Sequence, residues 1–429
     1  MDRQALPGGV RMIRNAKENK SMFDHNFEVR TKEGKTWHVI FLLVTIIAII
    51  SLTLLIFNIV DSVFGYVVIN TRVDPATLMV DGVALEDQTK EQMVTTLQKN
   101  LSRGAFNKLN NEKDFTNRTR DEVLALVEER ILKYEVLESW SLADSLLNKD
   151  AILTEYNTLI TENPRAELKF ISWLRWTRLV RPQSSEVATA GIRTAILGSL
   201  WTILITIVFA FPVGVGAAIY LEEYARDNWV NRVIQTNINN LAGVPSIIYG
   251  ILGLAIFVRA LEPLTSGSLF GLVDPTTANG RTILSAGLTL GLLVLPLIII
   301  NSQEAIRAVP QSLRNAGYGL GATKWQVTWA HVLPNALPGV LTGLILAVSR
   351  AIGETAPLVV VGASTAISFD PTSVFSKFTT LPIQIYQWTA RPQPEWQHLA
   401  GAAILVLLVL LLGLNAVAIV LRNKLSRKY

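Results

Sequence analysis

The stretch that decides the fold is an apolar run, TAILGSLWTILITIVFAFPVGVGAAIY, which extends from Thr194 to Tyr220. It contains no charged residue, and it exceeds the roughly 20 residues with which a helix crosses a hydrocarbon layer of about 30 Å. A run of this length and composition predicts a helix that spans a membrane.

Five further apolar runs lie along the chain. They cover residues 37–60, 241–258, 282–300, 338–363 and 398–421. Hydrophobic residues make up 50% of the 429-residue chain and charged residues only 17%, which is too apolar for an ordinary soluble protein of this length. The sequence therefore predicts an all-α membrane protein with six transmembrane helices.

The basic residues indicate how the six runs are oriented. An even number of spans places both ends of the chain on one side, where lysines and arginines gather in the tails and in the segments between runs. The short loops on the other side hold only Arg259, Arg281, Lys377 and Arg391. Because positively charged segments beside spans stay in the cytoplasm, both termini are predicted to be cytoplasmic.

This orientation divides the chain into five parts. They are a cytoplasmic N-terminal arm (1–36), the first transmembrane helix (37–60), an extracytoplasmic insert (61–193), a core with the other five helices (194–421) and a cytoplasmic tail (422–429).

The insert is expected to be a mostly helical docking or structural module. Asp81 and Gly82 stand between two apolar triplets and predict a tight hairpin. Apolar residues at helical spacing follow Thr119, which predicts a capped helix, and residues 141–161 predict an amphipathic helix. The insert contains no histidine and no cluster of metal ligands.

Several patterns exclude chemistry by this chain alone. Without cysteine it has no disulfide, thiolate metal site or thiol nucleophile. Gly34-Lys35-Thr36 ends like a phosphate-binding loop, but Val29 occupies the position of its leading glycine. The sequence thus predicts no catalytic residue, no metal, no cofactor and no nucleic-acid partner, and any nucleotide energy must come from another subunit.

Two ionisable residues, Arg350 and Glu354, lie well inside a predicted span. A charge at mid-membrane costs about 2.5 to 3.5 kcal/mol on insertion scales, so it is rarely kept unless it faces protein or water. The four-residue spacing places both side chains on one helix face.

Two interpretations of this pair stay open. It is either an internal ion pair that holds helices together, or part of a transport path in which Arg350 meets an oxyanion and Glu354 limits how tightly that anion is held. A carboxylate there also offers an acceptor for the proton of hydrogenphosphate, which sulfate lacks.

The segment between the fourth and fifth runs, residues 301–335, carries a motif. It contains Asn315-Ala316-Gly317, then Gly321, and it closes with Leu333-Pro334. This arrangement resembles the cytoplasmic coupling loop of ABC importer permeases, whose pattern is Glu-Ala-Ala, three residues, Gly, nine residues, Ile, one residue and Leu-Pro. Asn315, Gly317 and His331 depart from that pattern, which puts a charge contact from the missing glutamate in doubt.

The resemblance implies which residues of this segment couple the chain to an ATPase. They are Ala316, Gly321, Ala322, Trp325, Leu333 and Pro334. A glycine between two short helices lets the chain turn sharply and present one helix to a groove on a partner, with Trp325 as an anchor.

Further stretches resemble, more specifically, the PstA-type subunit of bacterial phosphate ABC importers. They are Asn240–Gly250, Pro338–Gly343, Ser349–Leu358, Leu381–Tyr386 and Arg391–Gln393. The resemblance extends over roughly residues 191–422, and the 61–193 insert is not part of the family pattern.

What the resemblance implies is a type I ABC importer permease in the bacterial plasma (inner) membrane, which moves phosphate inward by alternating access. Its implied partners are a homologous second permease, two copies of a cytoplasmic ATPase, an extracytoplasmic phosphate-binding protein and membrane lipid. Alternatives are a permease for sulfate or molybdate, a membrane sensor that uses the external module, and a symporter driven by an ion gradient.

Overall fold

The computed structural model describes residues 8–425, except residues 72, 81, 113, 133, 185, 186, 188, 189, 273–279, 364–366, 368 and 369. The chain divides into two compact units, Met1–Ile59 and Val60–Tyr429. The described part of the first unit is helix α1 (Gly8–Val63), whose last residues belong to the second unit. Residues Arg30–Val63 are long and apolar enough to cross a membrane, which agrees with the first predicted span.

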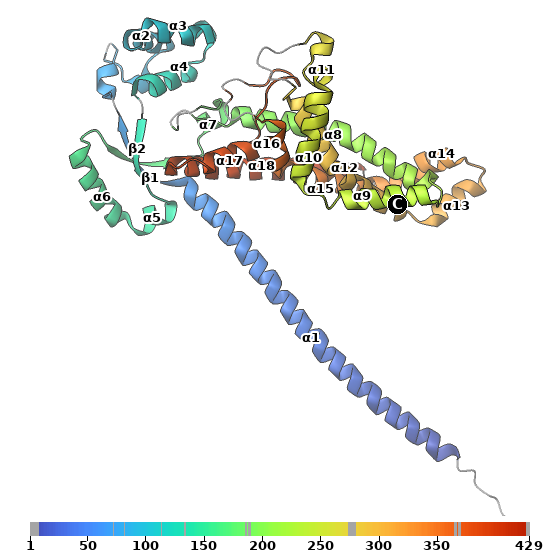
Figure 1. Cartoon of the computed structure of the whole chain (residues 1–429). Coiled ribbons are helices and arrows are strands. Elements are labelled where there is room, and N and C mark those ends of the chain that lie inside the picture. Colours follow the sequence, from blue (N-terminus) through green and yellow to red (C-terminus); the bar gives the residue numbers. More distant parts are fainter. Residues whose placement is uncertain are drawn as a thin grey trace, which may run out of the picture. The chain divides into compact units, whose positions relative to one another are not determined.

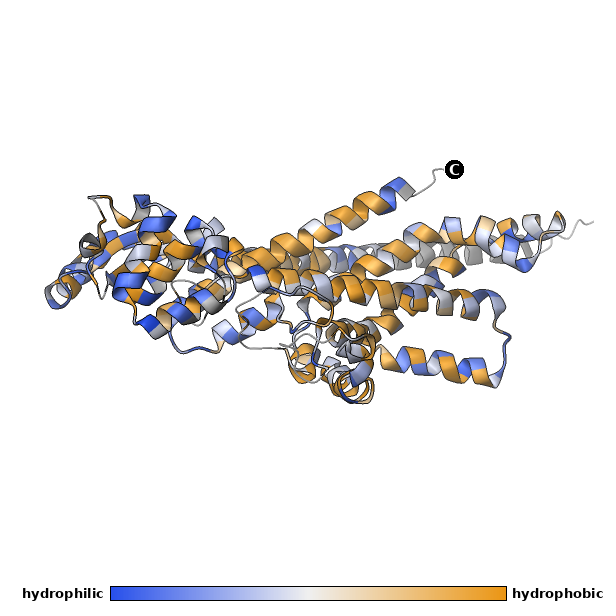
Figure 2. Ribbon diagram, turned by 90° about the horizontal axis from the view of Figure 1, so that it is seen from above, coloured by the Kyte–Doolittle hydropathy of each residue, from blue (hydrophilic) through white to orange (hydrophobic). Residues whose placement is uncertain are grey.

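Four helices of the second unit also have the length and composition of membrane spans (Figure 1). They are α8 (Arg193–Ile219) with a π-helical extension to Tyr224, α12 (Ile283–Arg307), the stretch Lys324–Gly353 that ends in α15 (Leu333–Gly353), and α18 (Pro394–Leu425). In Figure 2 the long helices are mostly orange, whereas the helices of the insert mix blue and orange. The predicted helical membrane core is confirmed.

Helix α12 lies at the centre of this core, packed against α8 and α15, and α15 packs in turn against α18. Two glycines allow α8 and α12 to approach closely. A Cβ atom on Gly287 would lie 2.6 Å from the side chain of Ile205, and one on Gly291 would lie 2.5 Å from that of Phe209. Lipid is as apolar as these side chains, so such close packing is what holds the spans together.

The third predicted span, residues 241–258, begins later than expected, because the chain bends sharply before Ser246. Helix α9 (Trp229–Leu241) and a helix from Ser246 to Ala260, which begins as α10 (Ser246–Gly253), meet at 107°. Pro245 accounts for the break, because proline lacks a backbone N–H and disfavours helical geometry at the residue before it. The described residues thus contain five spanning helices, or six if the bent pair counts as one.

The fifth predicted span, residues 338–363, is also interrupted. Helix α15 ends at Gly353, and the short helix α16 (Ala356–Val361) begins after Glu354 and Thr355. Pro357 lies in the first turn of α16, where its missing N–H is tolerated. In a continuous helix the same proline would leave the carbonyl of Gly353 without its partner, so the chain breaks before it.

The region predicted as an insert contains helices and, unexpectedly, a three-stranded sheet. Strand β1 (Phe64–Thr71) follows α1 directly and pairs antiparallel with β2 (Tyr134–Ser139) on one side and β3 (Glu167–Ser172) on the other. A mostly helical insert was therefore an incomplete description. The apolar residues of β1 follow the first apolar run closely, so the hydropathy pattern does not distinguish the strand from the end of a membrane span.

The helices of this region form two groups. Helices α2 (Lys90–Asn100), α3 (Arg103–Glu112) and α4 (Arg120–Val127) surround a small apolar core of their own. Helices α5 (Leu142–Leu147), α6 (Lys149–Glu162) and α7 (Trp176–Val180) accompany the sheet.

The local signals in the insert had mixed outcomes. Thr119 and Glu122 bond each other's backbone N–H groups at the start of α4, which confirms the predicted cap. Val80 and Val83 form one antiparallel bridge around Gly82, whose φ is +78°, whereas Asp81 lies outside the described residues. The single helix predicted over residues 141–161 is divided at Asn148.

The base of the sheet packs on α17 (Leu381–Thr389) and on the first turns of α18, where His398 lies. Its Nδ1 donates to the carbonyl oxygen of Ser62 at 2.6 Å, and its Nε2 lies 3.0 Å from Oγ of Ser139. The imidazole ring stacks on Trp173 with 5.4 Å between ring centroids. One side chain thus joins the end of the first helix, the sheet and the last span.

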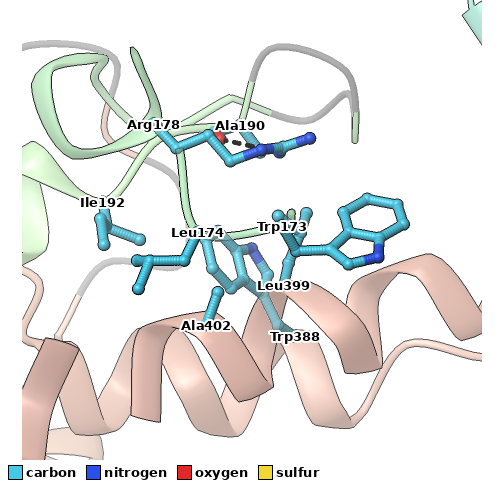
Figure 3. Close-up of a pocket in the computed structure, with 8 residues that line it drawn as sticks. All are labelled: Trp173, Leu174, Arg178, Ala190, Ile192, Trp388, Leu399 and Ala402. Atoms are coloured by element: carbon cyan, nitrogen blue, oxygen red, sulfur yellow. Dashed lines mark hydrogen bonds between the residues drawn. The ribbon is translucent and has the colours of Figure 1, made fainter. Parts of the chain in front are cut away.

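A small cavity lies beside this junction (Figure 3). Its volume is about 10 Å³, and Trp173, Arg178, Trp388 and Ala402 are among the residues that line it. The guanidinium of Arg178 donates to the carbonyl of Ala190 and lies over the Trp173 ring. Desolvation lowers the pKa of Arg178 to about 9, which still leaves it charged at neutral pH. The cavity holds at most one water, so it is a feature of packing.

Replacement of His398 by leucine should weaken this junction. The variant loses the hydrogen bond to the Ser62 carbonyl and the ring stack on Trp173, so we expect the free energy of unfolding to fall by about 1 to 3 kcal/mol. Thermal unfolding of the purified chain in detergent measures the change. Gln397→Ala, at the exposed neighbouring position, is the control and should leave the transition in place; equal effects of the two variants would contradict the assigned role.

Candidate functional site

Arg350 and Glu354 are brought together, but across a helix end. Arg350 lies in the last turn of α15, and Glu354 follows the helix with an extended backbone (φ −75°, ψ 125°). The prediction that both residues share one face of a continuous helix is therefore wrong, because the helix stops between them. Nε of Arg350 and Oε1 of Glu354 are 3.5 Å apart.

This separation leaves hydrogen-bonding capacity on Arg350. Strong pairs between a guanidinium and a carboxylate have N···O distances of about 2.7 to 2.9 Å, so the contact to Glu354 is long. The Arg350 side chain is 39% exposed and that of Glu354 is 18% exposed. Among the described residues, Arg350 forms no ion pair with another carboxylate, and its guanidinium can still receive an anion.

The two broken helices meet at this place. Helix α10 packs against α16, and a Cβ atom on Gly250 would lie 2.7 Å from Cα of Pro357. Helices that end or begin within a membrane core expose backbone dipoles, and in transporters such discontinuous helices commonly line the substrate site.

The predicted coupling segment consists of two short helices joined by a glycine turn. Helix α13 (Gln311–Gly319) is followed by Gly321, whose φ is +80°, and then by α14 (Lys324–Val327), which Thr323 and Gln326 cap. A positive φ strains residues with a Cβ atom, so the turn needs glycine there. The predicted turn at Gly321 is confirmed.

The remaining predicted coupling residues occupy different positions in this segment. Ala316 is exposed on α13, Ala322 is partly buried after the turn, and Leu333 and Pro334 form the partly buried first turn of α15. Trp325 is 60% exposed. Ala316, Gly321 and Trp325 therefore lie on the surface, whereas Leu333 and Pro334 lie partly buried at the start of α15.

Trp325 belongs to a patch of exposed apolar side chains. Leu320 is 90% exposed and Trp329 is 48% exposed, and the rings of Trp325 and Trp329 lie 5.1 Å apart between centroids. Large apolar side chains that gather on a surface indicate an interaction with another molecule. This coupling patch, Leu320, Trp325 and Trp329, has the character of a docking surface.

A buried ion pair that the sequence did not reveal fixes the coupling segment to the end of α8. Nε and Nη2 of Arg314 donate to Oε1 of Glu223 at 3.1 and 2.8 Å, and the same guanidinium donates to the carbonyls of Val309 and Ile306. The two charged side chains are only 10% and 5% exposed. Glu223 and Arg314 are 91 residues apart in sequence, so no spacing rule links them.

A second ion pair runs in parallel at the surface. Nη2 of Arg307 lies 2.6 Å from Oε1 of Glu222, and its Nη1 lies 3.0 Å from Glu304. The Arg307 side chain is 59% exposed. Neighbouring glutamates at the end of α8 therefore hold both the last turn of α12 and the first helix of the coupling segment.

Comparison with known proteins identifies the family. Residues 210–429 match the model of the family described as "Binding-protein-dependent transport system inner membrane component". The phosphate transport system permease protein PstA of Yersinia pestis is 33% identical over 249 residues, which are 58% of this chain and 77% of that protein. PstA of Mycobacterium leprae is 35% identical over 242 residues, 56% of this chain and 73% of that protein.

The chain belongs to the PstA-type permeases of this family. Among solved structures, this PstA-type chain is similar to a subunit of the inward-facing methionine transporter MetNI, with 18% identity and a TM-score of 0.41 over 55% of this chain and 98% of that one.

As a PstA-type permease the chain is a multi-pass membrane protein and a transport subunit. Its described residues contain no group of three or more histidine, aspartate or glutamate side chains placed to hold a metal ion. The features available for function are accordingly the Arg350 pair at the helix breaks, the coupling patch and the two ion pairs behind it.

The buried and the exposed ion pair of this PstA-type permease should differ in their effect on stability. Glu223→Gln leaves Arg314 buried without its counter-charge, so we expect the free energy of unfolding to fall by about 3 to 5 kcal/mol. Glu222→Gln faces a solvated arginine, and its cost should be at most about 1 kcal/mol.

Thermal unfolding of both variants in the same detergent measures this difference. Each substitution removes one negative charge from the same turn, so each is the matched control of the other. Losses of equal size would show that Arg314 does not depend on Glu223.

Proposed function

We propose that this chain is a transmembrane permease subunit of an ATP-driven importer of inorganic phosphate. The observation that carries the proposal is the identity of 33 to 35% to PstA phosphate permeases over about three quarters of their length. The same proposal gives the chain cytoplasmic termini and a place in the bacterial inner membrane, which the basic tails support.

In this proposal phosphate passes the helix breaks beside Arg350. The guanidinium matches an oxyanion with paired donors, and its long contact with Glu354 leaves those donors available. Glu354 lowers the net charge of the site, so the anion binds weakly enough to leave again. The carboxylate also offers an acceptor to the P–OH group of hydrogenphosphate, which favours phosphate over sulfate.

In this proposal, ATP hydrolysis by a partner subunit acts on the chain through the coupling patch. Two copies of a cytoplasmic ATPase lie beneath the permeases, one under this chain and one under a homologous second permease. The copy under this chain binds the exposed Trp325 and Leu320 side chains. Closing of the ATPase dimer moves α13 and α14, and the Glu223–Arg314 pair passes this movement to α8. The spans then open alternately to either side, and an extracytoplasmic phosphate-binding protein delivers the anion.

Loss of the Arg350 guanidinium should reduce phosphate uptake. A charge-assisted hydrogen bond contributes about 1.5 to 3 kcal/mol, so Arg350→Ala should lower uptake about tenfold or more, and Arg350→Lys, which keeps the charge without the fork, should lie between it and the parent chain.

Uptake of labelled phosphate by liposomes that contain the complete complex, loaded with ATP inside, measures the effect. Arg259→Ala is the control and should transport normally, because Arg259 lies near the end of the helix that runs from Ser246 to Ala260. Full uptake by correctly assembled Arg350→Ala would reduce this residue to a structural role.

The glycine turn should be needed for coupling. Gly321→Ala forces a residue with a Cβ atom into the left-handed region at a cost of about 1 to 2 kcal/mol, so the turn should distort and fewer phosphate ions should be carried per ATP hydrolysed. Gly319→Ala is a matched control, because a Cβ atom there meets no other atom within 4 Å and needs no positive φ.

The ratio of phosphate uptake to ATP hydrolysis in the reconstituted complex separates the two variants. We expect the ratio to fall by at least about half for Gly321→Ala and to stay unchanged for Gly319→Ala. An unchanged ratio in both variants would contradict a coupling role for the turn.

A further inference from the structure

A polar cleft lies at the coupling-segment end of the spans. Its volume is about 270 Å³, and it is bounded by the end of α8, the connection from α8 to α9, the polar face of α9 and the last turns of α12. Amide side chains form part of its wall, since Gln235 of α9 and Gln303 of α12 exchange hydrogen bonds at 2.8 and 3.1 Å.

Positive charge is in excess in this cleft. Three arginines, Arg226, Arg232 and Arg307, line it together with two carboxylates, Glu222 and Asp227. Arg307 is held by Glu222, and Nε of Arg232 lies 3.2 Å from Asp227 in a pair that is largely exposed. The Arg226 side chain is exposed and pairs with no carboxylate among the described residues. Glu304, outside the lining of the cleft, also pairs with Arg307. The positive charge left at the cleft without a carboxylate partner is therefore that of Arg226, which can meet a singly charged phosphate diester.

The side chains around the cleft place it at the surface of a membrane. Tyr220 is 53% exposed and Trp229 is 73% exposed, at the end of α8 and the beginning of α9. Aromatic side chains of this kind gather at the level of lipid headgroups. On the other side of α9 from Arg232, the exposed side chains include the apolar Val230, Val233 and Ile234 together with Asn237. The cleft thus opens where two spans end and an apolar helix face begins.

We propose that the cleft binds the phosphate group of an anionic phospholipid. The charged side chains alone could bind any phosphate, whether free or in a lipid. A free ion would not contact the exposed aromatic and apolar side chains beside the cleft, whereas a lipid would place its phosphate in the cleft and its acyl chains against those side chains. The proposal rests on the membrane topology assigned above, and it does not depend on which ion the permease transports.

A lipid in this position would bridge elements that carry the coupling segment. Its phosphate would contact Arg226 and Arg232 and share Arg307 with Glu222, next to the buried Glu223–Arg314 pair. The lipid would then hold the ends of α8 and α12 together while α13 and α14 move.

Native mass spectrometry of the full chain, purified from nanodiscs of phosphatidylglycerol and phosphatidylcholine, tests the proposal. The parent chain should retain phosphatidylglycerol in preference. Arg226→Gln with Arg232→Gln should weaken this retention about tenfold or more, since a charge-assisted hydrogen bond from an arginine to the phosphate contributes about a factor of ten. Arg226→Lys with Arg232→Lys keeps the charge and should retain most of the binding.

The matched control is Arg422→Gln with Lys424→Gln, which removes the same charge from the same end of the spans and should leave retention unchanged. Equal loss in the control would reduce the effect to general surface charge and would overturn the proposal. So would unchanged retention in the Arg226 and Arg232 variant. Displacement of the lipid by millimolar inorganic phosphate would assign the cleft to the free ion instead. Because no transport is measured, the outcome is independent of the uptake experiments.

Discussion

Within a hydrocarbon layer a backbone N–H or C=O group has no water to bond, so a helix can break there only if the protein supplies partners. Both breaks in this core obey that constraint. At the first, the N–H of Val244 and the hydroxyl of Tyr249 donate to the carbonyl of Leu241. At the second, the N–H of Glu354 donates to Ala351. The packing of α10 on α16, and with it the position of Arg350, depends on these bonds.

The coupling segment shows how one turn of a helix can serve two neighbours. Glu222 and Glu223 are consecutive, so their side chains leave the end of α8 in different directions, one to Arg307 at the surface and one to Arg314 in the interior. The exposed pair is weak and adjustable, whereas the buried one cannot separate without leaving a charge uncompensated. The buried pair therefore ties α13 to the end of α8.

Long apolar helices and local features such as helix caps can be predicted from the sequence, whereas contacts between distant segments cannot. The runs at 194–220, 282–300 and 398–421 became helices because length and apolarity alone decide that outcome in lipid. The turn at Gly321 was implied by the resemblance of residues 301–335 to the coupling loop of ABC importer permeases. The sheet and the Glu223–Arg314 pair join residues far apart in sequence, which no periodicity connects. Pro245 and Pro357 indicate where the helices break, but the apolar residues around them predict continuous spans.

The direct passage from α1 into the sheet sets a limit on how this protein can vary. Val63 ends the helix and Phe64 begins the strand, so one added residue at that point would change either the pairing register of β1 or the rotation of α1 about its axis. Because Val67 and Val68 are both fully buried, β1 tolerates no change of register. The surface connections between α2, α3 and α4 can lengthen without disturbing the strand register. Divergence among related chains should accumulate in that lobe, while the residue count across the helix-to-strand step stays constant.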